Sequence, residues 1–525
     1  MKEKIQLRLT PEQSVRPEKL IPAVAAALHV DPERVTYIQI TRRSIDARRR
    51  PVTVNLTANV FLDSYTPEDT RRYEPRVYRD VSDAPRVVIV GAGPAGLFAA
   101  LELLELGLKP IVLERGRDVD TRRRDQAELC RTGVVDPDSN YCFGEGGAGA
   151  FSDGKLYTRS TKRGPVDKVL QTFHAHGADD SVLVNVHPHI GTDRLPDIIK
   201  AMRHTILDHG GEVHFGTRVT SLIVRDGEVK GVRTADGSEY LGPVILATGH
   251  SARDVYAFLQ EAGADLEAKG IAVGVRLEHP QHLIDCIQYH SREGRGKFLP
   301  PAEYSMLTRV DGRAVYSFCM CPGGVIVPAA SAPGEMVVNG MSPSTRGTRW
   351  ANSGMVVEVL PEDLEALGYD TRDAMCMLRF QQDIERKFYE AAGRTLVAPA
   401  QRMTDFVAGR PSRDLPRSSY APGLQPAMMN ELLPAPVADR LRRGLEEFGR
   451  KARGFMTHEA VLIGDETRTS APLRVPRDRD TMQHTVLPGL YPCGEGAGYA
   501  GGIVSAAIDG INCARALAGK FPGHL

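Results

Sequence analysis

The sequence predicts an α/β protein of three parts, and three observations carry this prediction. An all-apolar run at residues 87–90, in "RVVIV", leads into a glycine-rich turn and a helix, which is typical of a buried parallel strand. Residues 1–84 carry strand and helix patterns of their own. Residues 265–480 mix strands and helices without another such turn. We expect a Rossmann-like domain (85–264 and 481–525), an inserted α+β substrate domain (265–480) and a small N-terminal α+β domain (1–84).

The N-terminal part is predicted from periodicity. Residues 35–42 and 52–62 alternate apolar and polar side chains, as half-buried strands do, and residues 4–10 form a third strand. A helix is expected over 17–30, with Pro17 in its first turn. The basic insert "DARRRP" is expected to be a solvated hairpin turn. Docking of a protein partner on residues 1–84 is left open.

Composition excludes several classes of function. The chain of 525 residues carries 66 basic and 66 acidic side chains, so no general attraction to nucleic acid or to a membrane is expected. It has no run of about 18 apolar residues that would predict a membrane span, and its first residues lack the apolar core of a signal peptide. Eight scattered cysteines fit a reduced, cytoplasmic protein. The oligomeric state is left open.

The glycine-rich turn "GAGPAG" has the full context of a dinucleotide site. Gly91 permits the tight turn, Gly93 lets a pyrophosphate approach the backbone, and Gly96 lets the helix pack on the sheet. The helix that begins near Pro94 offers free N–H groups and a partial positive charge to phosphates. Glu114 closes the second strand and is placed to accept hydrogen bonds from an adenosine ribose.

A second formal GxGxxG lies in "SNYCFGEGGAGAFSDGKLYTR" (139–159), at Gly144, Gly146 and Gly149. A polar, turn-rich stretch precedes it instead of a buried strand, and Gly154 follows too soon for a helix. A loop without side chains still exposes backbone N–H groups that bind anions. We therefore expect a single dinucleotide, with this stretch, the cradle loop (139–159), folded over it.

Together the motifs resemble a known family. "GAGPAG…LERG", "FGEGGAGAFSDGKLYT", "FCMCPGG", "NGMS", "ETRTSAPLR" and "YPCGEGAGYAGGIVSAAIDG" are similar to those of the bacterial family of uncharacterised FAD-dependent dehydrogenases, over most of the chain. More distantly, the chain is similar to FAD/NAD(P)-binding two-dinucleotide-fold flavoproteins with an inserted substrate domain. The resemblance implies bound FAD and an oxidoreductase fold, but no substrate. Cys142 departs from the family, which carries a polar residue there.

The resemblance also implies where FAD contacts the chain. The adenine is expected near the strand that begins at Val219, and an acid for the ribityl hydroxyls is expected at Glu495. The N-terminus of the last helix is expected at the pyrimidine edge, where its dipole would stabilise negative charge on reduced flavin. The expected cofactor contacts are Gly91, Gly93, Pro94, Ala95, Gly96, Glu114, Arg115, Gly116, Gly146, Gly147, Ala148, Ser152, Asp153, Lys155, Arg218, Val219, Thr248, Gly249, Gly494, Glu495, Gly501, Gly502 and Ile503.

Three charged side chains are candidates for catalysis. Lys155 in the cradle loop would favour hydride arrival at flavin N5 and donate a proton, or it binds phosphate or solvent instead. Arg276 and Glu278 share one face of a strand in the inserted domain. They are candidates for a substrate pocket, and structural ion pairs explain them equally well.

The cysteines and histidines are not expected to form a metal or redox centre. Cys319 and Cys321 lie two apart in "FCMCPGG", whereas redox pairs of flavin disulfide reductases lie on the helix of the dinucleotide unit. We expect these two to pack or to line the pocket. The histidines of "HPHIGTD" lack a partner at metal-ligand spacing, so no metal is expected.

The sequence therefore predicts an FAD-dependent oxidoreductase that transfers a hydride between flavin N5 and an unidentified small organic molecule. NAD(P)H is a possible transient electron donor, because no second complete fingerprint is present. A flavin monooxygenase and a non-enzymatic flavoprotein that acts as a redox sensor or scaffold are the alternatives. Neither the substrate nor the direction of transfer follows from the sequence.

Overall fold

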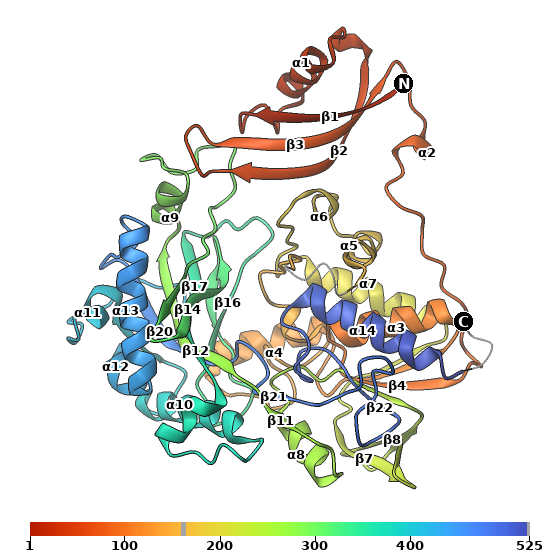
Figure 1. Cartoon of the computed structure of the whole chain (residues 1–525), viewed down its shortest axis with the longest axis vertical. Helices are drawn as coiled ribbons and strands as arrows, with labels where there is room; N and C mark the ends of the chain where they lie inside the picture. Colours follow the sequence, from red (N-terminus) through yellow and green to blue (C-terminus); the bar gives the residue numbers. More distant parts are fainter. Residues whose placement is uncertain (159–163, 522–525) are drawn as a thin grey trace.

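The computed structural model describes residues 1–158 and 164–521, and it shows three groups of strands (Figure 1). A small sheet lies at the top of the view, a parallel sheet lies below it on the right, and a large mixed sheet lies on the left. No helix in the described part of the chain is long and apolar enough to cross a membrane.

The small sheet contains β1 (Lys2–Leu9), β2 (Val35–Asp46) and β3 (Thr53–Leu62), in the antiparallel order β1-β3-β2. Helix α1 (Pro17–Leu28) packs Leu20 and Val24 against Leu56 and Val60 of β3, and η1 (Pro32–Arg34) follows it. The edge of β2 reaches the rest of the molecule, where Val186 N donates to Arg43 O at 3.0 Å. A linker with the short α2 (Pro67–Thr70) leads to the parallel sheet.

The parallel sheet has the strand order β22-β10-β4-β5-β6. Its strands are β4 (Arg86–Val90), β5 (Lys109–Leu113), β6 (Glu212–His214), β10 (Val244–Leu246) and β22 (Leu490–Pro492). Helices α3 (Pro94–Leu106) and α14 (Ile503–Ala518) cross closely on one face (Figure 1). A Cβ atom on Gly510 of α14 would lie 2.0 Å from the carbonyl oxygen of Ala95, so only glycine permits this crossing.

Further helices and a small antiparallel sheet surround these five strands. The helices are α4 (Val119–Thr132), α5 (Val166–Ala175), α6 (Ser181–Val184), α7 (Leu195–Asp208) and α8 (Arg253–Glu261). The antiparallel sheet β7-β8-β9 comprises Val219–Arg225, Glu228–Thr234 and Glu239–Leu241. This sheet leads directly into β10. Because β10 is parallel to β4, the residues that follow it lie at the carboxyl edge of the parallel sheet.

The mixed sheet has seven strands in the order β13-β14-β17-β12-β20-β18-β19. They are β12 (Ile271–Pro280), β13 (Leu307–Val310), β14 (Arg313–Cys321), β17 (Trp350–Val359), β18 (Ala398–Arg402), β19 (Leu424–Pro426) and β20 (Val461–Glu466). Around it lie α9 (Gln281–Gln288), η4 (Pro361–Leu367), α10 (Cys376–Ala391), α11 (Met403–Val407), α12 (Met429–Leu432) and α13 (Ala435–Lys451). Two small ladders, β11 (Glu267–Ala268) with β21 (Leu473–Arg474) and β15 (Val325–Pro328) with β16 (Val338–Met341), complete the fold.

The elements predicted from periodicity are confirmed. The three strands and the helix of the N-terminal part are present. The strand, glycine turn, helix and strand expected over 86–114 form β4, α3 and β5. The α/β class with a Rossmann-like parallel sheet is therefore confirmed.

One carboxyl group in the mixed sheet is buried without a hydrogen bond to its side chain in the described part of the protein. Asp465 of β20 is fully buried, and neither of its side-chain oxygens has a hydrogen-bond partner among the described residues. Burial, together with the nearby charge of Glu385, raises the pKa of Asp465 well above its ordinary value. The folded protein must therefore hold a proton that the unfolded chain would release.

We predict that the variant Asp465→Asn gains stability over the wild type as pH rises. The folded pKa is raised, so the contribution of Asp465 is fully present below the unfolded pKa and is lost as pH rises toward the folded pKa. The gap in unfolding free energy should widen by at most about 1.4 kcal/mol per pH unit above about pH 4. Urea unfolding at several pH values measures it. Asp226→Asn, in an exposed turn, is the control, and a gap that does not change with pH would contradict the prediction.

Candidate FAD site

A cavity of about 800 Å³ lies between the parallel sheet and the mixed sheet. Residues that follow β4, β5 and β10 line one side of it, as expected for a ligand bound outside the carboxyl ends of parallel strands. The cradle loop and the N-terminal end of α14 line it as well. The opposite wall includes Phe318 and Cys319 of the mixed sheet and Asn339 of the β15–β16 ladder.

Most of the expected cofactor contacts meet in this one cavity. The lining includes Gly91, Gly93, Pro94, Ala95, Glu114, Arg115, Gly147, Ala148, Ser152, Asp153, Lys155, Arg218, Val219, Thr248, Gly249, Glu495, Gly501, Gly502 and Ile503. Gly96, Gly116, Gly146 and Gly494 are not among the lining residues. Gly96 serves packing, because a Cβ atom there would lie 1.9 Å from Gly91 O.

The carboxylate of Glu114 joins the two glycine-rich loops. It accepts backbone N–H groups from Ala92 at 2.9 Å, Gly116 at 2.9 Å and Gly144 at 3.0 Å. Glu114 is 5% exposed and lines the cavity. A carboxylate offers about four acceptor sites, so it retains capacity for a ribose hydroxyl.

Arg122 of α4 holds the cradle loop from behind. Its fully buried guanidinium donates to the carbonyl oxygens of Asn140, Tyr141, Glu145 and Gly147 at 2.7–3.0 Å. Because these carbonyls point away from the cavity, toward α4, the loop can present backbone to a ligand. The sequence prediction missed Arg122, since no local pattern marks a side chain that bonds a loop some twenty residues further along the chain.

Three observations test whether this cavity fits FAD. The carboxylate of Glu495 lines it and has no hydrogen-bond partner among the described residues, as an acceptor for ribityl hydroxyls should. A Cβ atom on Gly501 or Gly502 would meet only open space. Gly502, the residue before α14, gives the helix no side-chain cap, so N–H groups of its first turn remain free for the pyrimidine edge. The residues present therefore fit the cofactor.

Glu495 also carries a shifted pKa. Burial raises the pKa of its carboxyl group to about 7, and the nearby Lys269 offsets only part of this effect. The group therefore titrates close to neutral pH.

Lys155 lies on the wall that faces the mixed sheet. Its ammonium donates to Met320 O and lies 3.9 Å from the carboxylate of Asp153. Asp153 is already held by Arg346 at 2.6 Å, and Arg346 also contacts Glu303 at 2.6 Å. Although burial alone would raise the pKa of Asp153, these cations lower it.

Arg276 and Glu278 do not line the cavity. Arg276 is fully buried in β12, where it pairs with Glu466 at 2.6 Å and donates to Cys319 O at 2.7 Å. Glu278 accepts the backbone N–H of Ser419 at 3.0 Å. Their charges are used inside the mixed sheet, so the structural alternative explains them and direct contact with a substrate is not supported.

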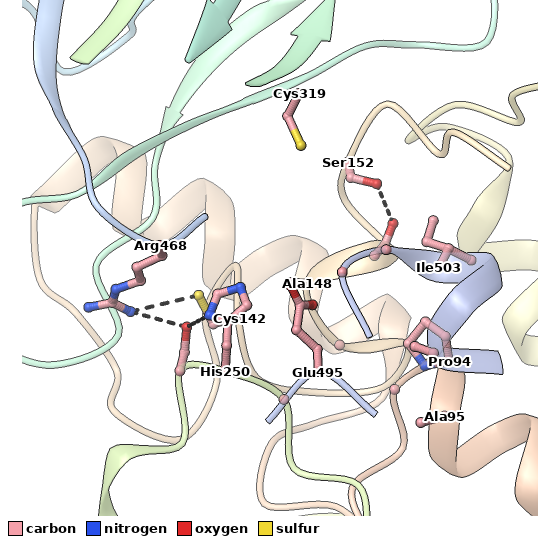
Figure 2. A pocket seen from close by; sticks show the side chains of 18 of the residues that line it. Pro94, Ala95, Cys142, Ala148, Ser152, His250, Cys319, Arg468, Glu495 and Ile503 are labelled. Atoms are coloured by element: carbon pink, nitrogen blue, oxygen red, sulfur yellow. Dashed lines mark hydrogen bonds between the residues drawn. The ribbon is translucent and has the colours of Figure 1, made fainter. Parts of the chain in front are cut away.

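Figure 2 shows residues of the cavity that the sequence did not assign to the cofactor. Arg468, Cys142 and His250 lie on the opposite side of the cavity from Ile503, and the Cys319 side chain points into it. Arg468 pairs with Glu335 at 2.7 Å and with Glu385 at 2.9 Å. Burial and the charge of Arg468 lower the pKa of His250 to about 4, so its ring is neutral at pH 7.

Comparison with known proteins places these features in families. Residues 85–240 match an FAD-binding domain, and residues 194–316 match an FAD-dependent oxidoreductase domain. Residues 270–469 match the C-terminal domain of FAD-dependent proteins, and residues 1–61 match a domain of unknown function. A protein of Clostridium beijerinckii described as an "uncharacterized protein" is 38% identical over 515 residues, which are 95% of each chain.

Solved structures are similar only at a distance. A flavin-dependent brominase has a TM-score of 0.36 and 14% identity, covering 83% of this chain and 79% of its own. A geranylgeranyl bacteriochlorophyll reductase-like protein from Thermoplasma acidophilum has a TM-score of 0.34 and 15% identity, covering 83% and 79%. Likeness at this level says nothing about the substrate.

We predict that Arg122→Met weakens FAD binding by at least about tenfold and destabilises the protein by about 3 kcal/mol. The substitution leaves several buried carbonyls without a donor, at about 1–3 kcal/mol for each that stays unpaired. Titration of flavin fluorescence and urea unfolding measure the two effects. Arg124→Met, on the same helix but exposed, is the matched control and should change neither.

We predict that FAD binds more tightly as pH rises from 6 to 8. The Glu495 carboxylate accepts hydroxyl groups better than the protonated acid, and its pKa of about 7 means that FAD must displace a proton below that pH. In Glu495→Gln this dependence should disappear, because the amide does not titrate. An equal pH dependence in both proteins, measured as Kd at each pH, would refute this role.

Proposed function

Because the chain belongs to a family of bacterial FAD-dependent flavoproteins, we propose that it transfers a hydride between the flavin N5 and a small organic substrate. The enzyme class, an FAD-dependent oxidoreductase, follows from the matched domains. The hydride step is our proposal. The observation that supports it is that the cavity lining extends beyond the expected cofactor contacts onto the mixed sheet, at Phe318 and Cys319.

The chain's own residues supply binding and polarisation. When bound, FAD supplies the group that takes up or releases the electron pair. The backbone N–H groups of Gly93 and Ala95 and of the first turn of α14 are uncapped by side chains and are offered to negative charge. Glu495 would orient the ribityl chain of FAD by accepting hydrogen bonds from its hydroxyl groups. The glycines keep side chains out of this space.

Lys155 is the residue we assign to the substrate. An ammonium has three donors, and Met320 O uses one of them. The remaining donors can hold a substrate oxygen and stabilise charge that develops on it during hydride transfer. Tyr157 and His187, whose rings lie 4.6 Å apart, and Phe318 line the same cavity and offer apolar contact to a planar molecule.

We predict that Lys155→Met slows hydride transfer by about 100-fold and changes the Kd of FAD by less than about threefold. Purified protein is reduced anaerobically with NADH or NADPH, or with dithionite, and the flavin is then reoxidised with 2-cyclohexenone or 1,4-benzoquinone in a stopped-flow instrument. Lys155→Arg keeps the charge and should retain more activity than Lys155→Met. Equal rates in all three proteins would remove Lys155 from the mechanism.

The same measurements decide between the proposed function and its alternatives. Transfer of an ¹⁸O atom from dioxygen into a product would overturn the hydride proposal in favour of a monooxygenase. A flavin that none of these donors or acceptors reduces or reoxidises would favour a sensor or scaffold. NAD(P)H is retained as a donor only if it reduces the flavin within the catalytic time scale.

A further inference from the structure

A pair of buried cysteines lies beneath the segment that carries Glu495. Cys493 follows β22 directly, and Cys513 lies on α14. Both are fully buried, and their sulfur atoms and a carboxylate oxygen of Asp509 all lie within 4.8 Å of one another. Residues 494–512, between the two cysteines, include Glu495, Gly501 and Gly502 of the cavity wall.

The surroundings of this cluster disfavour a metal ion. Arg477 pairs with Asp509 through two contacts of 2.6 and 2.9 Å, and it also lies 3.5 Å from the sulfur of Cys513. A cation would have to sit beside this guanidinium.

We propose that Cys493 and Cys513 form a reversible dithiol–disulfide pair that joins the two ends of residues 494–512, the segment that carries Glu495. The two sulfurs lie within 4.8 Å of each other, so a small displacement separates them from the disulfide bond length of about 2.05 Å. With hydrogen peroxide as oxidant, each thiol loses one proton and one electron, and the S–S bond forms. The O–O bond of the peroxide breaks, and its two oxygen atoms leave as two water molecules. The oxidant is small enough to reach a buried pair.

The disulfide would act on the cofactor through the backbone. Asp509 accepts the N–H of Gly494 at 2.7 Å, so the start of the segment is already held to α14. A covalent bond one residue earlier restrains the segment between β22 and α14, and with it Glu495. The effect on the cofactor rests on the proposed FAD site, whereas formation of the disulfide does not. We expect FAD to leave the oxidised protein several-fold more slowly than the reduced protein.

Oxidation of the FAD-loaded protein tests the pair. Full-length protein is treated with hydrogen peroxide, denatured, alkylated and digested without reductant. We expect a mass lower by two hydrogen atoms, two of the eight thiols protected, and a joined peptide that contains Cys493 and Cys513 and separates with dithiothreitol. Cys513→Ala should lose the joined peptide, and Cys376→Ala, another buried cysteine, should keep it.

Several outcomes would overturn the proposal. They are alkylation of all eight thiols after peroxide, protection of Cys319 and Cys321 within a single peptide instead, or one equivalent of zinc that protects the pair. The wild-type peptide map decides the matter even if Cys513→Ala does not fold. If the disulfide forms but FAD leaves oxidised and reduced protein at equal rates, the coupling to the cofactor is wrong.

Discussion

The site depends on two charged side chains that hold the first glycine turn and the cradle loop in place. Glu114 accepts hydrogen bonds from N–H groups of the first glycine turn and the cradle loop. Arg122 donates hydrogen bonds to carbonyl groups of the cradle loop. Both lie in the interior, where an unmet backbone group is costly. One carboxylate and one guanidinium thus satisfy seven backbone hydrogen bonds and leave the cavity side of both loops to a ligand.

The second wall of the cavity is fixed in a similar way. Arg276 pairs with Glu466 inside the mixed sheet and bonds the carbonyl of Cys319, where the pairing of β14 and β17 shifts register. Cys319 has a φ of 43° and points into the cavity. The charges in the mixed sheet therefore act through the backbone that they position. The ion pair of Arg346 with Asp153 joins this wall to the cradle loop, so the two sides of the cavity are tied together across Lys155.

The two sides of the cavity differ in the charges and hydrogen-bond donors that they present. On the side of Ile503, free N–H groups and Glu495, whose pKa is about 7, face the cavity. On the side of Cys142, Arg468 is neutralised by Glu335 and Glu385, and His250 is held neutral. The unneutralised donors therefore lie where the resemblance places the flavin pyrimidine. The cysteine pair below the Glu495 segment adds a second kind of restraint to that end.

The sequence by itself determined the class of the fold, the single dinucleotide unit and most of the cavity lining, because glycine turns, apolar strands and helix starts are local patterns. It also excluded the second GxGxxG as a Rossmann turn from its flanks, and among the described residues of that loop a 3₁₀ turn, η2 (Gly147–Gly149), forms in place of a long helix. The tertiary structure alone showed the contacts of Arg122 and Arg468 and the proximity of Cys493 to Cys513, and it removed Arg276 and Glu278 from the cavity. Each of these depends on partners tens to hundreds of residues away, and such contacts leave no periodic trace in the chain.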